Sequence, residues 1–183
     1  MTSAHPPAAG RIFVSYSTRD KAAAEEVCRF LEGAEFPCWM APRDISPGEE
    51  WGAAIVRAVG DTHLMVLLWS AAANDSPQIR REVERAASRG IPIICFRLEN
   101  VLPSGSLEYY LSTVHWLDAF RVSRPEALEQ LLQAIRNPPA RSVPPPGALR
   151  PRRRRKVIAA GAAAVLLAVL GISLFAPPFG TPP

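Results

Sequence analysis

The sequence lacks the cysteine patterns that mark a disulfide framework or a zinc site. It has three cysteines, an odd number, and they form no CxxC pair and have no histidine at ligand spacing. We therefore expect Cys28, Cys38 and Cys95 to be buried, reduced thiols, and we expect no bound metal.

Several nucleotide-binding and catalytic motifs are also missing. No GxGxxG follows the first predicted strand and no GKS or GKT occurs, so neither a Rossmann dinucleotide site nor a P-loop is encoded. The third predicted strand ends in Trp69-Ser70, where a phosphoacceptor receiver of similar topology would carry an aspartate. The histidines stand in the leader (His5) and at strand starts (His63 and His115), which gives no support to a Ser-His-Asp triad.

Acidic residues are absent after Glu129, and this divides the chain electrostatically. Up to residue 140 there are 17 acidic and 14 basic residues, a charge of −3, whereas residues 141–183 carry seven basic residues and +7. The pI of about 9.3 therefore reflects the C-terminal part of the chain. The preceding domain has no basic surplus for phosphates, so we expect no nucleic-acid partner.

Charge is absent altogether from residues 157–175 (VIAAGAAAVLLAVLGISLF), which are long enough to cross a bilayer. The alternative is a helix packed on the domain, but the segment has no polar face. The basic run 150–156 precedes it, and the positive-inside tendency then keeps the domain in the cytoplasm. The sequence predicts a single-pass membrane protein, with a disordered leader (1–10), a Pro/Arg-rich linker (138–156) and a short tail (176–183).

Apolar runs alternate with amphipathic stretches between the leader and the linker. The uninterrupted apolar runs predict a parallel sheet with helices on both faces, of the flavodoxin-like order 2-1-3-4-5. The predicted strands are 12–16, 36–40, 63–69, 91–97 and 114–117, and the predicted helices are 20–33, 47–59, 77–87 and 124–135.

Three of these helices carry an N-terminal signature. Ser76-Pro77 places proline directly after an N-cap serine, and residues 123–126 (SRPE) form a capping box. Residues 46–49 (SPGE) have the same pattern, with Pro47 at the first helical position. This pattern predicts a loop of only five residues (41–45), followed by a helix with Trp51 on its apolar face.

The topology predicts where a ligand should bind. In such sheets ligands bind beyond the carboxyl ends of the strands, and the segments that end there are 15–19 and 70–76, both rich in hydroxyl and amide groups. On the following helix, Glu82 lies about 60° from Ile79 at the edge of the apolar stripe, whereas Glu84 points to solvent. A half-buried Glu82 would have a raised pKa. The alternative is a surface acid flanked by arginines.

Four segments together resemble a Toll/interleukin-1 receptor (TIR) domain of the bacterial type. They are RIFVSYSTRDK (11–21), CWMAPRDISPGEEW (38–51), VLLWSAAANDSPQIRREVERAASRGIPII (66–94) and YYLSTVHWLDAF (109–120). They occur in the expected order and spacing, and the resemblance extends over residues 11–137. The family has the flavodoxin-like fold predicted above.

The resemblance implies an activity and a site. Many TIR domains are NAD⁺ glycohydrolases, some of which cyclise the ADP-ribose product; NAD⁺ is a substrate there, and no cofactor is implied. The family's catalytic glutamate matches Glu82. The implied binding residues are Ser15, Tyr16 and Ser17 along the pocket, Trp39 stacking on a ring, Asp44 in the covering loop, and Asn74 and Ser76 at the nicotinamide end.

Each binding residue also has a structural alternative. Trp39 could be a core residue, Tyr16 a strand aromatic, and Asn74 and Ser76 turn and cap residues. The sequence departs from the best-known animal enzymes of the family at Gln78, where those enzymes carry a tryptophan four residues before the glutamate.

Three functions remain compatible with the sequence. The first is a membrane-anchored NAD⁺ nucleosidase that acts when clustered, in signalling or defence. The second is a non-enzymatic adaptor that assembles with other TIR domains through the 41–45 loop. The third is a hydrolase or transferase that acts on nucleosides.

Overall fold

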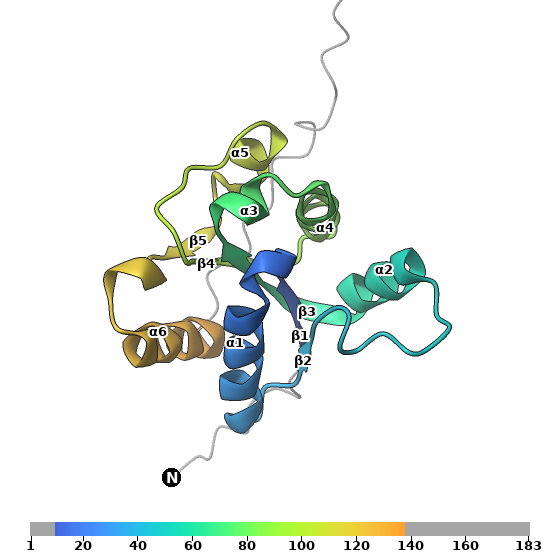
Figure 1. Cartoon of the computed structure of the whole chain (residues 1–183), viewed down its shortest axis with the longest axis horizontal. Helices are drawn as coiled ribbons and strands as arrows, with labels where there is room; N and C mark the ends of the chain where they lie inside the picture. The colour runs from blue at the N-terminus through green and yellow to red at the C-terminus, as the bar shows by residue number, and fades with distance from the viewer. Residues whose placement is uncertain (1–9, 138–183) are drawn as a thin grey trace, which may run out of the picture. The chain divides into compact units, whose positions relative to one another are not determined.

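The computed structural model describes residues 10–137, which form a parallel five-stranded sheet with helices on both faces (Figure 1). The sheet order is β2-β1-β3-β4-β5, as the sequence predicted. The strands are β1 (Arg11–Ser15), β2 (Cys38–Trp39), β3 (Thr62–Trp69), β4 (Ile93–Arg97) and β5 (His115–Leu117). The helices are α1 (Lys21–Gly33), α2 (Trp51–Asp61), α3 (Ala71–Asn74), α4 (Pro77–Ser88), α5 (Ser106–Leu111) and α6 (Arg124–Arg136), with 3-10 turns η1 (Thr18–Asp20) and η2 (Ala119–Arg121).

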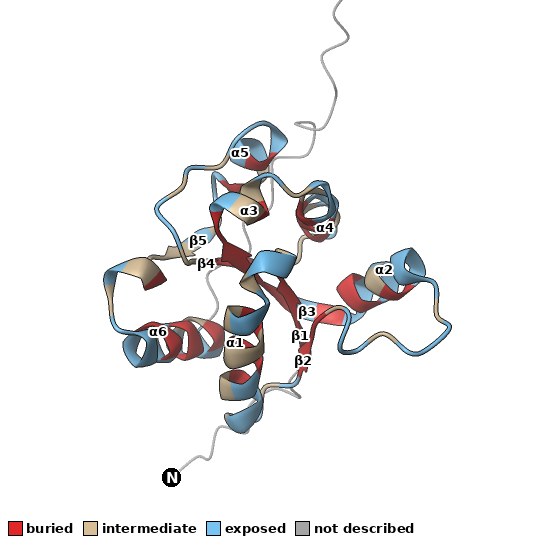
Figure 2. Ribbon diagram, viewed as in Figure 1, coloured by how far each residue is buried: buried red, intermediate tan, exposed pale blue. Residues whose placement is uncertain are grey.

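The two faces of the sheet are covered by different helices, and each face has its own core (Figure 2). Alternate residues of β3 point to opposite faces: Val66 belongs to the core under α1 and α6, and Leu67 to the core under α2 and α4. Because both faces are buried, a central strand must be apolar at nearly every position. This is why the uninterrupted runs in the sequence predicted β3 and β4 correctly.

The start of α2 differs from the prediction. Gly48 has a φ of +82°, in the left-handed region, so the chain is not helical there. Residues 46–49 form a turn instead, in which the Glu49 amide donates to the Ser46 carbonyl (3.0 Å). The helix begins at Trp51, and its N-cap is Glu50, whose carboxylate accepts from the amides of Gly52 and Ala53 at 2.8 and 2.7 Å. The predicted five-residue loop was therefore wrong, and the connection runs from Met40 to Glu50.

The other two helix starts follow the sequence. The hydroxyl of Ser76 accepts from the Ile79 amide at the start of α4, and that of Ser123 accepts from the Glu126 amide at the start of α6. The short helices α3 and α5 were not predicted. Only Gly10 of the predicted leader is described, and the predicted linker, transmembrane helix and tail lie outside the described residues. Within residues 10–137, no helix has the length and apolar character to cross a membrane.

Candidate active site

A pocket of about 620 Å³ opens at the carboxyl end of β1, between three segments that are far apart in the sequence. These segments are the exit of β1 with η1 and the start of α1, the loop after β2 with the first residue of α2, and the first turns of α4. The lining residues are Phe13, Val14, Tyr16, Ser17, Thr18, Lys21, Ala41, Pro42, Trp51, Ser76, Pro77, Gln78, Arg81 and Glu82. The pocket therefore lies at the edge of the sheet where the topology predicted a ligand site.

Glu82 is a carboxylate that α4 holds almost out of contact with solvent, at 5% exposure. One carboxylate oxygen, Oε2, accepts a hydrogen bond from the Ser15 hydroxyl at 2.7 Å, and Oε1 accepts from the Gln78 side-chain amide at 3.0 Å. Ser15 is the last residue of β1, and Gln78 stands one turn earlier on α4. Two elements of the fold thus fix the orientation of this side chain.

Opposing effects act on the pKa of Glu82. Burial raises the pKa because it disfavours the charged carboxylate, and the hydrogen bonds from Ser15 and Gln78 lower it; burial is the largest of these effects, so the pKa is above its usual value. Within residues 10–137, no cation pairs with this carboxylate. A buried acid with a raised pKa and no salt bridge is typical of functional sites.

The pocket rim carries cations and a restrained tyrosine. Lys21 and Arg81 are exposed at the rim, from α1 and α4 respectively. The Tyr16 hydroxyl donates to the Ala41 carbonyl and so joins the exit of β1 to the loop after β2. Burial raises the pKa of Tyr16, with a smaller contribution from nearby Glu25. Tyr16 therefore remains a neutral donor that helps to position the 40–50 loop.

The charged residues of the 40–50 loop bind within the domain. The Asp44 carboxylate accepts from the Met40 amide at 2.8 Å, and the Arg43 guanidinium contacts Glu32 on α1 at 2.7 Å and the Cys38 carbonyl at 3.0 Å. Arg43 also pairs with Asp44 at 2.9 Å. These contacts tie the loop to α1 and to the end of β2, and neither side chain lines the pocket.

The structure brings five of the predicted site residues together. The pocket is lined by Tyr16, Ser17, Ser76 and Glu82. Ser15 lies behind this lining and donates a hydrogen bond to Glu82. The remaining three, Trp39, Asp44 and Asn74, are elsewhere.

Trp39 and Asn74 have structural roles here. Trp39 is 4% exposed, and its indole stacks on the Phe13 ring with 5.0 Å between centroids and 17° between planes. This agrees with the alternative that Trp39 is a core residue. The Asn74 side chain accepts from the amide and hydroxyl of Ser104, which joins the end of α3 to the loop before α5.

Gln78 and Trp51 are among the pocket residues that the sequence did not indicate as part of the site. Gln78 was noted only as a departure from the family, yet its i, i+4 spacing from Glu82 places the two on one face of a helix and could have indicated the contact. Trp51 was interpreted as an apolar anchor of its helix, and this was wrong, because the side chain is 53% exposed. The apparent capping box predicted that α2 starts at Pro47, whereas the helix starts at Trp51, and this start sets the direction of the Trp51 side chain.

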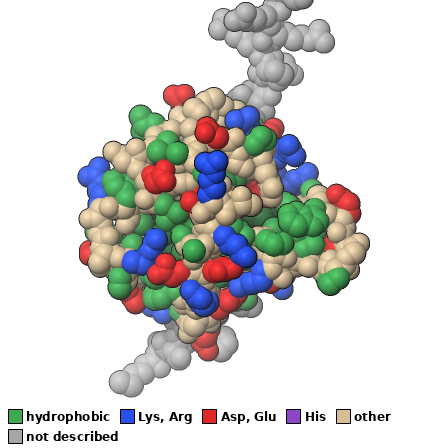
Figure 3. All heavy atoms as spheres, in the orientation of Figure 1, with side chains coloured by type: hydrophobic (Ala, Val, Ile, Leu, Met, Phe, Trp, Pro, Cys, Tyr) green, Lys and Arg blue, Asp and Glu red, His purple; other side chains and the backbone are tan. Residues whose placement is uncertain are grey.

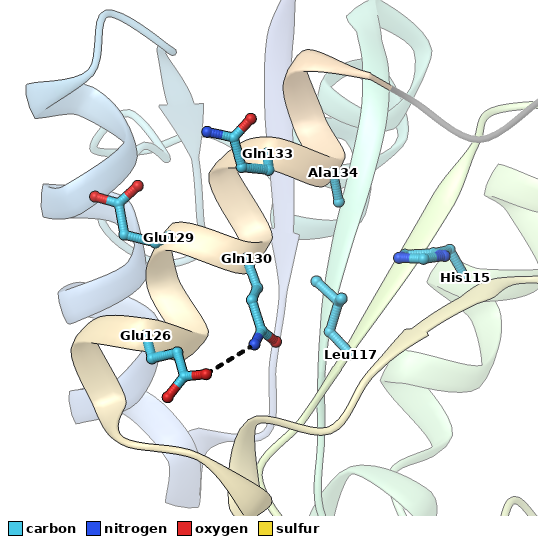
Figure 4. A pocket seen from close by; sticks show the side chains of 7 residues that line it. All are labelled: His115, Leu117, Glu126, Glu129, Gln130, Gln133 and Ala134. Carbon is cyan, nitrogen blue, oxygen red and sulfur yellow. Dashed lines mark hydrogen bonds between the residues drawn. The ribbon is translucent and has the colours of Figure 1, made fainter.

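A second hollow of about 660 Å³ lies between β5 and α6 (Figure 4). Its lining includes His115 and Leu117 from β5 and Glu126, Glu129 and Gln130 from α6. The side-chain amide of Gln130 donates a hydrogen bond to the Glu126 carboxylate. The polar residues are exposed, and none is held by two donors in the way that Ser15 and Gln78 hold Glu82. It is thus the weaker candidate for chemistry, although it is slightly larger.

The described residues offer no metal site. Within residues 10–137 no cluster of three or more His, Cys, Asp or Glu side chains could hold an ion, and the three cysteines are free and buried.

A serine substitution tests whether Ser76 has a role beyond capping. Replacing Ser76 with alanine removes the N-cap bond of α4 and should lower the free energy of unfolding by about 1 kcal/mol, measured by urea denaturation. Ser123→Ala is the matched control, because it removes the same type of cap from α6, away from the pocket. The affinity of the pocket at β1 for a ligand should fall only in Ser76→Ala. An equal fall in affinity in Ser123→Ala would show that lost stability alone is responsible.

Comparison with known proteins agrees with this fold. The family model described as TIR domain matches residues 12–132. The TIR domains of the activated Roq1 resistosome superimpose with a TM-score of 0.59 at 12% identity, covering 69% of this chain and 99% of that chain. The TIR domain of the Toll-related receptor TRR-2 from Hydra magnipapillata gives 0.54 at 22%, covering 69% and 98%. A metazoan TIR-STING receptor from C. gigas also gives 0.54 at 22%, with 74% of this chain matching 42% of the receptor. No curated protein sequence matches the chain.

Proposed function

Because the chain belongs to the TIR domain family, as the match over residues 12–132 shows, we propose that its pocket binds NAD⁺ and cleaves the nicotinamide–ribose bond. The observation that carries this proposal is the geometry of Glu82. A single carboxylate, 5% exposed and hydrogen-bonded on both oxygens, lies in the wall of a pocket of about 620 Å³, large enough for a nucleotide.

The proposed reaction is a substitution at the anomeric carbon of the nicotinamide ribose. The C1′–N bond breaks, its electron pair leaves with nicotinamide, and positive charge develops on C1′ and the ring oxygen. Water then adds to C1′ and loses a proton, which gives ADP-ribose; an internal nucleophile of the same molecule would give a cyclic product. The Glu82 carboxylate holds the ribose hydroxyls and stabilises the developing charge, in a site where low solvent exposure strengthens the interaction.

The rest of the pocket matches the charge of the substrate. Lys21 and Arg81 stand on the rim, and the N-terminus of α4, with its positive end of the helix dipole, faces the pocket through Ser76 and Gln78. Within residues 10–137, Arg81 forms no ion pair with a carboxylate, so its guanidinium is available for a diphosphate.

Nicotinamide release by the full chain tests the proposed activity. We expect the purified chain, clustered through a bivalent antibody against an N-terminal tag, to release nicotinamide from NAD⁺, as detected by liquid chromatography. The Glu82→Ala variant should release none. Absence of product from the clustered wild type would overturn the enzymatic proposal, and an equally active variant would overturn the assignment of Glu82. Parallel incubation with nucleosides and nucleoside monophosphates distinguishes the nucleoside-hydrolysing alternative.

An adaptor function is the second candidate, and exposed apolar side chains on the domain favour it. Leu102 is 80% exposed and Tyr109 on α5 is 44% exposed, which suits contact with another protein. If the domain acts only as an adaptor, its assembly with other TIR domains should survive Glu82→Ala but not Leu102→Asp. Light scattering should show that only Leu102→Asp fails to assemble.

We also propose that the chain is anchored in a membrane, with the TIR domain in the cytoplasm and clustering as the activating event. The apolar segment 157–175 and the basic run before it support this proposal. Protease added outside intact spheroplasts should leave the domain uncut, and digestion from outside would overturn the orientation.

A further inference from the structure

Trp51 is unusual among the large apolar side chains of this domain. It is the first residue of α2, it is 53% exposed, and it lines the same pocket as Glu82. Figure 3 shows hydrophobic side chains gathered on the molecular surface over the start of α2, beside a hollow. Exposure of a large aromatic side chain to water is unfavourable, so a ligand that covers this side chain at the rim of a pocket gains binding free energy.

The other aromatic rings of the pocket are already engaged. Phe13 is 2% exposed, and one face of its ring is stacked on Trp39. The hydroxyl of Tyr16 is bonded to the Ala41 carbonyl, and the residue is half-buried. Among the described residues that line the pocket, Trp51 is therefore the aromatic side chain with most of its surface open to a ligand.

The backbone around Trp51 is well fixed. The preceding Glu50 caps the helix with two hydrogen bonds, to the amides of Gly52 and Ala53. Glu49 pairs with Arg57 on the next turns of α2. The ring thus projects from the rigid end of a helix and not from the middle of the 40–50 loop, so little conformational entropy is lost when a ligand stacks on it.

We propose that Trp51 is the aromatic platform of this pocket and stacks on a heteroaromatic base of the substrate while Glu82 acts on the glycosidic bond. The inference rests on the proposed function for the identity of the substrate, and it assigns to Trp51 the stacking role that the family resemblance had suggested for Trp39. Base–aromatic stacking tolerates any planar base, so the platform contributes affinity, whereas the polar groups around Glu82 set the geometry.

Substituted chains separate stacking from simple burial. In the full chain, Trp51→Leu keeps an apolar side chain without a stacking face, and we expect KM for NAD⁺ to rise about tenfold or more while kcat stays within about twofold. Trp51→Phe should restore KM to within about threefold of the wild type. Val56→Ala is the control, because Val56 is also an exposed apolar residue of α2 but does not line the pocket, and its KM should be unchanged.

Binding without turnover identifies the base and separates this proposal from the activity. AMP and nicotinamide mononucleotide are titrated by calorimetry against the Glu82→Gln chain with and without Trp51→Leu. Weaker binding of either probe in the Trp51→Leu background supports the platform, and the probe affected shows which base stacks. That result would stand even if the wild type released no nicotinamide, in which case only the proposed activity would fail.

Three results would overturn the platform. One is binding of both probes at equal affinity with and without Trp51→Leu. Another is failure of both probes to bind the chain that retains Trp51. The third is failure of the Trp51→Leu chain to assemble with itself in light scattering, which would show that Trp51 contacts a second copy of the chain and not the base.

Discussion

Replacing Glu82 with glutamine is expected to lower the rate of nicotinamide release by about a hundred- to a thousandfold, the effect typical of removing a preorganised group that stabilises transition-state charge. Glutamine retains the volume and one oxygen acceptor for the donors at Ser15 and Gln78, but it carries no charge. The loss should therefore appear in kcat more than in KM. Glu84→Gln on the exposed face of α4 is the matched control and should retain activity to within about twofold.

The same substitution should change stability in the opposite direction. The folded-state pKa of Glu82 is raised by burial, so the folded protein binds more protons than the unfolded chain between the two pKa values. Wild-type stability then falls as pH rises from about 4.3, the unfolded value, through the folded pKa. Glu82→Gln lacks this loss. Urea denaturation from pH 4 to pH 8 should show the variant gaining stability relative to wild type as pH rises, with a plateau above the folded pKa.

A less stable variant across this whole pH range would indicate that the amide fits the site poorly. Its loss of activity would then reflect misfolding, and the catalytic assignment would rest on Glu82→Ala. A stable, inactive Glu82→Gln chain with an active Glu84→Gln control would show a trade of stability for function, as is common in active sites.

The fold was predictable because burial on both faces of a sheet leaves a strong mark in the sequence. β3 and β4 must be apolar at almost every position, and serine caps mark the starts of α4 and α6. The edge strand β2 has two residues where five were predicted, since only Cys38 and Trp39 pair with β1. Its neighbours Phe36 and Met40 pack against the core without belonging to the sheet.

The loop before α2 shows what local patterns do not determine. Residues 46–49 satisfy the composition of a capping box, but the positive φ of Gly48 makes them a turn. The choice depends on contacts that come from elsewhere in the chain, such as Tyr16 with Ala41 and Arg43 with Glu32. The same change makes Trp51 the first residue of α2, at the pocket rim.

The position of Glu82 was predicted better than its environment. Helical geometry placed it at the edge of the apolar stripe, half-buried, whereas the structure leaves 5% of it exposed. A single helix gives no information about what packs against it, and Ser15 arrives from β1, 67 residues earlier. The two donors that hold this carboxylate are therefore a tertiary feature, and their removal should have the second large effect.

We expect Ser15→Ala and Gln78→Leu each to lower kcat/KM at neutral pH by about tenfold, and the double variant by about a hundredfold. Both donors stabilise the charged carboxylate and lower its pKa, so their loss raises the pKa of Glu82 further. Activity that needs the carboxylate then shifts to higher pH. These variants do not substitute the other ionisable residues that line the pocket, which are Tyr16, Lys21 and Arg81.

The measurement is the pH profile of kcat/KM between pH 5 and pH 9. In the wild type, activity should fall as pH decreases through the folded pKa of Glu82, and this acid limb should lie at higher pH in each variant, with activity partly recovered at alkaline pH. Ser17→Ala is the matched control, because the Ser17 hydroxyl lines the pocket but bonds the Arg19 amide. An equal loss at every pH would show that Ser15 and Gln78 contact the substrate instead of tuning the charge of Glu82.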